Sequence, residues 1–363
     1  MRPFTYDALP GRVVFAPGAF DGTANELSRL GAERALLIAD RSGASWAERL
    51  HAALSTAIVA TIDDVLPHVP IERAEAARRL AREADADVVI TLGGGSATGL
   101  GKAVALEVPL PILAIPTTYA GSEMTPIWGL TTNARKETGR DPRVLPRTVI
   151  YDPLLTLSLP PSIAGPSGIN AMAHCAEALY ADGANPVTSL MAEEGIRVLR
   201  DGLPRVVASP GDIDARSDVL AGAYLAGACF AAAGSGIHHK ICHVLGGAYD
   251  LPHAEMHTVI LPHALAFNAP AVPEAMARMA AALGEADVPA AVYDLAVSLG
   301  APTSLAAIGM READLDAATR LIVAAAPRNP RPVTEPAIRA LLMEAFRGRR
   351  PSLGAAARYQ VSR

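Results

Sequence analysis

The stretch Val88-Val-Ile-Thr-Leu-Gly-Gly-Gly-Ser-Ala-Thr-Gly-Leu-Gly-Lys102 decides the fold of this chain. Its first residues, Val88–Thr91, form a short apolar run that is typical of a buried strand, and three glycines follow soon after. The spacing beyond them predicts a helix over Thr98–Glu107. A strand that enters a helix through a glycine turn is a building block of a parallel sheet with helices on both faces.

Strands and helices alternate in the same way on both sides of this stretch. We expect further strands at Arg12–Phe15, Ala35–Ala39, Ala57–Ile62, Ile112–Ile115 and Val149–Tyr151, and helices at Ala19–Leu30, Ser45–Leu54 and Ile71–Ala84. The alternation predicts an α/β, Rossmann-like nucleotide-binding domain over residues 1–157.

After Asp152-Pro153 the pattern becomes entirely helical, and an all-α domain is expected over residues 158–363. Helices are predicted at Pro166–Asp182, Val187–Asp201, Ala215–Ala232, Ile237–Tyr249, Pro273–Leu283, Val288–Leu299, Glu312–Ala324 and Glu335–Arg347. The residues from Arg349 onward are interpreted as a loosely held tail.

Composition narrows the class of protein. At 363 residues two domains are the natural expectation, and a content of 50% hydrophobic and 19% charged residues favours a large buried core. The net charge of -5, with no basic run, argues against nucleic acid as a partner. Three cysteines without a C-x-x-C motif indicate a reducing compartment. Because neither a signal peptide nor a spanning apolar run is found, we expect a cytoplasmic protein without a membrane partner.

The glycine turn is a candidate phosphate site. Gly93, Gly94, Gly95 and Ser96 lie between a strand and a helix, where backbone N–H groups and the helix N-terminus can bind pyrophosphate. The motif is neither G-x-G-x-x-G nor a P-loop, and a simple tight turn is the alternative. Asp40, at another strand end, suits a ribose hydroxyl, and Thr117-Thr118 follows a third strand. Lys102 is either a solvated helix residue or a phosphate neighbour.

A second candidate site is the segment from Gly234 to His253, which holds His238, His239, His243 and His253 out of nine histidines. His239 and His243 lie one helical turn apart on one face. Neutral imidazoles can bind a metal, shuttle a proton or donate to a developing oxyanion. The alternative is a set of core histidines, and His257 and His263 are interpreted in that way. Glu177 is interpreted as a helix-face or domain-contact residue.

Together these pieces resemble the iron-containing alcohol dehydrogenase superfamily, which shares its two-domain plan with dehydroquinate synthase. The resemblance covers nearly the whole chain. It rests on Gly93–Ser96, Pro116-Thr-Thr118, Gly121-Ser-Glu123, Asp152-Pro153, Gly168–Ala178, His239–His253 and Leu261-Pro-His263. Within the superfamily, Gly93–Lys102, Pro116–Pro126 and His238–Gly247 are most similar to the maleylacetate reductases.

The resemblance implies a change at the metal site. Metal-dependent members hold the ion at positions that fall here on Asn170, His174, His239 and His253. Because an amide stands where those members have a carboxylate, the site lacks its anionic ligand, and we expect an enzyme without a metal. Three neutral imidazoles can still bind zinc, so a metal-dependent alcohol or polyol dehydrogenase is the alternative.

The resemblance also implies the reaction, which is reduction of the C=C bond of maleylacetate to 3-oxoadipate with NADH, or with NADPH if the ribose pocket accepts it. His243 is expected to donate the proton or stabilise the enolate, while His239, His253 and His174 polarise the ketone oxygen or bind a carboxylate. Candidates for binding the dicarboxylate substrate are Asn170, Tyr119, His238 and Lys240.

Two further expectations follow from this resemblance. A dianionic substrate and an acidic chain fit together only if the pocket is locally positive, so we expect protonated histidines there. The family resemblance favours a homodimer. A lyase like dehydroquinate synthase is a less favoured alternative, because the basic residues that such an enzyme would need do not surround the histidines.

Overall fold

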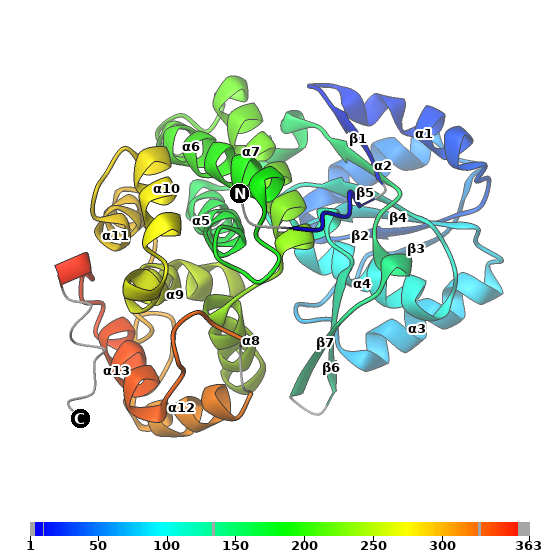
Figure 1. Cartoon of the computed structure of the whole chain (residues 1–363). Coiled ribbons are helices and arrows are strands. Elements are labelled where there is room, and N and C mark those ends of the chain that lie inside the picture. The colour runs from blue at the N-terminus through cyan, green and yellow to red at the C-terminus, as the bar shows by residue number, and fades with distance from the viewer. Residues whose placement is uncertain (1–3, 10, 133–134, 326–327, 355–363) are drawn as a thin grey trace. The chain divides into compact units, whose positions relative to one another are not determined.

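The computed structural model describes residues 4–9, 11–132, 135–325 and 328–354 (Figure 1). It divides into two compact units. The sheet unit contains the described residues of Ala8–Pro160 together with Gly211–Leu220. The helical unit contains Pro161–Pro210 and the described residues from Ala221 onward, with residues 4–7. The sequence analysis placed the boundary between the two domains after residue 157. The inclusion of Gly211–Leu220 in the sheet unit was not foreseen from the sequence.

The sheet unit is built on six parallel strands. They are β1 (Arg12–Phe15), β2 (Ala35–Ala39), β3 (Ile58–Ile62), β4 (Val88–Gly93), β5 (Ile112–Pro116) and β8 (Thr148–Tyr151). Their order across the sheet is β1-β8-β5-β4-β2-β3. All six predicted strands are confirmed, with ends that differ from the prediction by at most two residues. β2, β4 and β5 are buried along their whole length, which is why they read as unbroken apolar runs.

Helices cover both faces of this sheet (Figure 1). They are α1 (Thr23–Leu30), α2 (Ala44–Ala53), α3 (Ile71–Glu83) and α4 (Gly95–Glu107). Leu27 of α1 and Leu50 of α2 join one core cluster with Leu37 and Ile90 of the sheet. On α4, a Cβ atom at Gly101 would collide with the Thr91 side chain, so glycine allows the helix to lie close against β4. The predicted α/β class is therefore confirmed.

One sheet element was not predicted. β6 (Ile127–Thr132) and β7 (Arg135–Arg140) form a separate antiparallel hairpin. The sequence of β7, Arg-Lys-Glu-Thr-Gly-Arg, contains no apolar residue, so the alternation that marks a half-buried strand is missing. Tertiary context therefore determines this hairpin.

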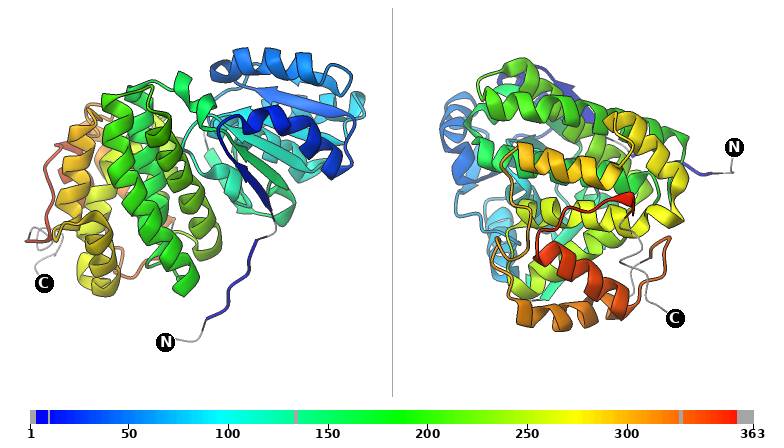
Figure 2. Two further views of the ribbon diagram at one scale, coloured as in Figure 1. Left: turned by 90° about the horizontal axis from the view of Figure 1, so that it is seen from above. Right: turned by 90° about the vertical axis from the view of Figure 1, so that its left-hand side faces the viewer.

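The helical unit contains only helices and connecting segments among its described residues, which confirms the predicted all-α class. Its helices are α5 (Pro161–Ala178), α6 (Pro186–Ala208), the part of α7 (Ile213–Ala233) that follows Leu220, α8 (Ile237–Tyr249), α9 (His253–Asn268), α10 (Pro273–Leu283), α11 (Val288–Ser298), α12 (Leu315–Ala324) and α13 (Glu335–Phe346). The eight predicted helices are all present. α5 and α6, drawn in green, pack side by side (Figure 2). α5 and α6 run through Pro166 and Pro204, which the sequence interpretation did not anticipate.

The sequence did not predict α9, although this helix is central to the unit. It packs against α5, α8, α11 and α13, and every residue from Met256 to Asn268 is buried. A helix buried all round lacks the polar face that gives the 3.6-residue period, and Pro262 lies in its interior. Both properties conceal it from a search for amphipathic helices.

The tail prediction is wrong for the residues just after α13. The Arg350 guanidinium pairs with Asp294 at 2.5 Å, and the Leu353 N–H donates to the Asp287 carboxylate at 3.1 Å. Residues 355–363 lie outside the described part of the chain. Within the described residues no single helix is long and apolar enough to cross a bilayer, although α7 and α8 meet the criterion together as a bent pair.

Candidate active site

Three strand ends in the sheet unit bring the predicted cofactor residues together. From β2 the chain proceeds to β3 on one side, and from β4 to β5 on the other, so the strand order reverses between β2 and β4. Ala39 pairs with Leu92, and Gly93 pairs with Pro116. The residues that follow these pairs are Asp40, the glycine turn and Thr117-Thr118. Ligands of open α/β sheets bind at such a reversal, outside the carboxyl ends of the strands.

The glycine turn is held against Asp40. Gly93 has a φ of 149°, and a Cβ atom added there would collide with the Asp40 carboxylate. The Gly94 N–H donates to Asp40 Oδ2 at 2.7 Å. Gly94 is the N-cap of α4 and has no side chain with which to cap it, so the first turn of this helix is open to an anion. Gly94, Gly95 and Ser96 are partly exposed. This geometry fits the pyrophosphate of a dinucleotide.

Asp40 also has a local structural role that the sequence did not reveal. Its Oδ1 accepts hydrogen bonds from the backbone N–H groups of Ser42 and Gly43, at 3.0 and 3.2 Å. A carboxylate oxygen can accept two hydrogen bonds, so Oδ2 can still accept one from a ribose hydroxyl in addition to that from Gly94. The ribose contact stays a prediction. Thr117 is buried beside Ser42, with 3.2 Å between the hydroxyl oxygens, and Thr118 is partly exposed.

Two charged or polar side chains of this unit lie deeper than expected. Lys102 is 1% exposed, and its Nζ donates to five oxygens of Ser122, Thr125 and Ile127 at 2.6–3.3 Å. Lys102 is therefore neither a solvated residue nor free to bind phosphate. Tyr119, predicted to bind substrate, is completely buried, and its hydroxyl lies 3.4 Å from the Arg216 guanidinium. Its role in binding substrate stays a prediction.

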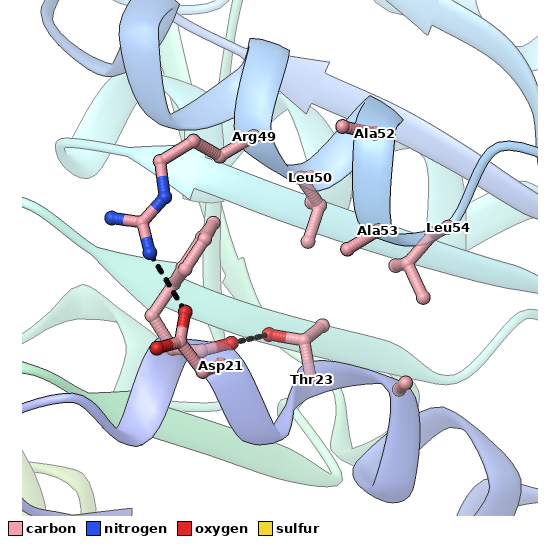
Figure 3. Close-up of a pocket in the computed structure, with 9 residues that line it drawn as sticks. Asp21, Thr23, Arg49, Leu50, Ala52, Ala53 and Leu54 are labelled. Carbon is pink, nitrogen blue, oxygen red and sulfur yellow. Dashed lines mark hydrogen bonds and ion pairs between the residues drawn. The ribbon is translucent and has the colours of Figure 1, made fainter.

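The sheet unit also has a hollow of about 490 Å³. It lies between α2 and the residues that begin α1, and an ion pair between Arg49 and Asp21 spans it (Figure 3). Its lining contains none of the predicted cofactor or substrate residues. We therefore do not assign the reaction to it.

In the helical unit, six histidines form one cluster from α5, α8 and α9. The ring centroids of His174 and His239 are 4.9 Å apart, and the ring of Phe230 lies within 4.6 Å of both. His243 lies 6.2 Å from His239 along α8. The remaining members are His238, His253 and His257, which are linked by centroid distances of 4.4–5.1 Å. The structure thus brings together the four predicted catalytic histidines and His238.

His257 is the member that the sequence interpretation placed outside the site. It lies one turn after His253 on α9, so the failure to predict this helix also hid the pairing. His257 Nδ1 is 2.9 Å from His238 Nε2, which is a hydrogen bond between two completely buried rings. His238 was predicted to bind the charge of the substrate, and that role stays a prediction. In the structure its side chain is enclosed and bonded to another histidine.

Burial disfavours the protonated form of three of these six rings. It lowers the pKa values of His174, His238 and His257 well below 6.5, and the neighbouring imidazoles lower them further. Protonated forms of these three rings therefore do not supply the positive pocket that the sequence interpretation expected at neutral pH. Lys240 and His243 are partly exposed, and His253 is exposed.

Glu177 contacts the cluster directly, which the interpretation from sequence missed. It is completely buried at the end of α5. Its Oε2 lies 2.6 Å from His239 Nδ1, and its Oε1 accepts from the backbone N–H of His238 at 2.8 Å. Glu177 is thus a buried helix-face residue that contacts α8, and its interpretation as a domain contact stays a prediction.

The family's metal positions fit a divalent ion poorly in this chain. Asn170, His174 and His239 are buried, and Asn170 Oδ1, His174 Nδ1 and His239 Nε2 have no hydrogen-bond partner among the described residues. The rings of His174 and His239 stack at 19°, so their in-plane lone pairs do not converge on one point. Within the described chain, the group of three ligand atoms that lie within 4.8 Å of one another comes from His238, Cys242 and His257. These are not the family's ligand positions.

Comparison with known proteins identifies the class. Residues 10–153 match the model of the iron-containing alcohol dehydrogenases, and residues 165–346 match the C-terminal part of the same family. The chain belongs to the iron-containing alcohol dehydrogenase family. This confirms the predicted fold and the class of enzyme, an oxidoreductase, and it supports the use of NAD(H).

Particular relatives narrow the class further. The chain is 52% identical to a maleylacetate reductase of Burkholderia cepacia over 352 residues, which cover 97% of this chain and all of that protein. The crystal structure of maleylacetate reductase from Agrobacterium tumefaciens is 48% identical, with a TM-score of 0.92, and the match covers 97% of this chain and all of that one. A putative alcohol dehydrogenase from Ralstonia eutropha JMP134 is 54% identical, with a TM-score of 0.95 and the same coverage. The predicted resemblance to maleylacetate reductases is confirmed.

Proposed function

We propose that this protein reduces the C=C bond of 2-maleylacetate to 3-oxoadipate with NADH. The proposal rests on the sequence identity of this chain to several maleylacetate reductases, which is 47–52% over nearly the full length. The cluster of six histidines supplies groups that suit this chemistry. A conjugated keto acid is already activated towards hydride, so proton donors and oxyanion stabilisers are the groups it needs from the protein.

The roles of the residues follow from the charges that the reaction creates. Bound NADH would supply the hydride, which adds to the carbon β to the ketone. Negative charge then develops on the ketone oxygen as an enolate, and a proton is needed at the neighbouring carbon. We assign the proton to His243, which is partly exposed and can exchange with solvent. We assign polarisation of the oxygen and binding of a carboxylate to His239, His174 and His253, with Asn170 and Lys240 as further contacts for the substrate.

We assign NADH as the main reductant because of Asp40. A carboxylate at the ribose accepts hydrogen bonds from the 2′- and 3′-hydroxyls and repels a 2′-phosphate. NADPH is accepted only if that carboxylate turns away, and its bonds to Ser42, Gly43 and Gly94 oppose such a turn.

We further propose that turnover requires no metal ion, although the family is named for iron. Asn170 contributes no charge at the place of the family's carboxylate, and a dication bound by neutral groups alone is held weakly. The substitution Asn170→Asp tests this point. We expect it to tighten Zn²⁺ binding at least about tenfold, measured by calorimetry, because it restores an anionic ligand. Equal Zn²⁺ affinity in both proteins would contradict the explanation.

The proposed activity is tested by following NADH oxidation with enzymatically generated maleylacetate, before and after treatment with a chelator. We expect turnover in both cases and less than one equivalent of bound metal by elemental analysis. Activity with 1,2-propanediol or glycerol that disappears with the chelator would instead favour the metal-dependent alcohol or polyol dehydrogenase. Release of phosphate from the dehydroquinate synthase substrate would favour the lyase. Cytoplasmic localisation, a homodimer and the lack of nucleic-acid and membrane partners stay predictions.

A further inference from the structure

Glu177 uses both of its carboxylate oxygens for two consecutive residues of α8. Oε1 accepts from the His238 backbone N–H, one of the first N–H groups of the helix, which have no partner within the helix itself. Gly236, the N-cap, has no side chain to do so, and a Cβ atom there would lie 2.9 Å from Oε1. The carboxylate on α5 therefore caps α8 from outside, at the positive end of its dipole.

The second oxygen determines the state of a catalytic ring. An ionised carboxylate accepts hydrogen bonds and donates none, so the 2.6 Å contact between Oε2 and His239 requires a proton on Nδ1. In the neutral ring the lone pair is then on Nε2. That atom is buried, and it has no hydrogen-bond partner among the described residues.

His239 differs in this respect from the other buried rings of the cluster. His238 and His257 bond to each other, and the contacts of His174 with Phe230 and His239 are ring contacts. In His239, the ring nitrogen Nδ1, opposite Nε2, is hydrogen-bonded to the Glu177 carboxylate. When a proton resides on Nε2 during the reaction, that carboxylate compensates the charge on the ring, as a carboxylate does behind the histidine of other proton-transferring pairs.

We propose that Glu177 is a positioning residue for the reduction, because it fixes His239 with Nδ1–H towards the carboxylate and Nε2 towards the substrate. Once Nε2 has taken up a proton from solvent by way of the partly exposed His243, it donates a hydrogen bond to the substrate's ketone oxygen and keeps that proton. This inference rests on the proposed function for its effect on turnover. Its effect on the state of His239 does not depend on the substrate.

The substitution Glu177→Gln has a defined consequence in this geometry. The His238 N–H still needs a hydrogen-bond acceptor, so the amide oxygen of the new glutamine takes the position of Oε1. Its NH₂ group then takes the position of Oε2. That NH₂ donates to His239 Nδ1, which must give up its proton, and the ring changes to the Nε2–H form. We expect ¹⁵N chemical shifts of labelled histidine to report this change of tautomer for His239.

The Nε2–H of this neutral ring is a weaker hydrogen-bond donor than that of an imidazolium whose charge a carboxylate compensates. We therefore expect kcat to fall about 100- to 1,000-fold, with KM for maleylacetate changed less than about threefold. Glu177→Asp keeps a carboxylate and should recover at least about tenfold of the loss. The matched control is Glu123→Gln, which neutralises another buried carboxylate, bonded to Tyr151 at 2.6 Å in the sheet unit. We expect this control to keep kcat within about threefold per folded molecule.

Two outcomes would overturn the inference. One is a folded Glu177→Gln protein that keeps the Nδ1–H form of His239. The other is a change of tautomer without loss of kcat, or a loss no larger than that of the control. If the unmodified protein does not oxidise NADH with maleylacetate, the proposed function fails, but the tautomer measurement still decides whether Glu177 sets the state of His239.

Discussion

Two buried polar clusters in this molecule differ in how completely their hydrogen bonds are made. Around Lys102 in the sheet unit, five oxygens accept from one ammonium group. Around His239 in the helical unit, buried atoms of Asn170, His174 and His239 have no partner among the described residues. A buried polar atom without a hydrogen-bond partner lowers stability, so most buried polar atoms in folded proteins have a partner. Breaking the first cluster should therefore lower stability more than changing the second.

The largest effect is expected from breaking the satisfied cluster. Lys102→Met removes the donor from five oxygens, and we expect the free energy of unfolding to fall by about 3–5 kcal/mol in urea denaturation. Burial lowers the pKa of Lys102 to about 7, while the Glu123 carboxylate raises it, and three of the five oxygens are carbonyls, which can only accept. Because this cluster is structural, kcat per folded molecule should be unchanged. A stable variant with a specific loss of kcat would show that the lysine has a part in the reaction.

A pH effect of intermediate size is expected from His263, a completely buried ring on α9. Burial lowers the pKa of His263 from 6.5 to about 3. As the pH falls below 6.5, His263 therefore becomes protonated in the unfolded chain but stays neutral in the folded chain. The free energy of unfolding should therefore decrease on acidification, by up to about 1.4 kcal/mol per pH unit from this residue. His263→Leu should show a shallower slope between pH 6.5 and 4. Parallel slopes for the two proteins would contradict the assignment.

The smallest effect on stability, and one of opposite sign, is expected from a substitution in the unsatisfied cluster around His239. Asn170→Leu replaces a buried amide whose Oδ1 has no partner in the described part of the chain, so we expect stability to stay the same or rise by about 1 kcal/mol. The KM for maleylacetate should rise about tenfold because a contact for the substrate is lost. Calorimetry and steady-state kinetics on one preparation measure both. A loss of several kcal/mol would show that the amide is structural, like Lys102.

The parts of the fold that the sequence predicted are those with a strong local signal. Unbroken apolar runs such as Ala35–Ala39 marked the buried strands. Since parallel strands end at one edge, Asp40 and the glycine turn could be expected to meet. The hairpin over Ile127–Arg140 and the helix α9 gave no such signal, because one is polar and the other is buried all round.

The candidate site was predicted as far as its residues lie close in the chain. His239, His243 and His253 were found in one segment. His257 was missed because α9 was not predicted. Glu177 was missed because its partner His239 is 62 residues away, and only the fold, in which α5 and α8 both pack against α9, brings them into contact. Neither spacing nor composition contains that information.

The bonds of Lys102 also couple the stability of residues 122–127 to that of α4. The backbone carbonyls of Ser122, Thr125 and Ile127 face one nitrogen, and that nitrogen belongs to α4. The bend of the chain around it gains its stability only after α4 has docked on the sheet. In native-state hydrogen exchange, residues 122–127 should therefore open together with α4 as one cooperative unit.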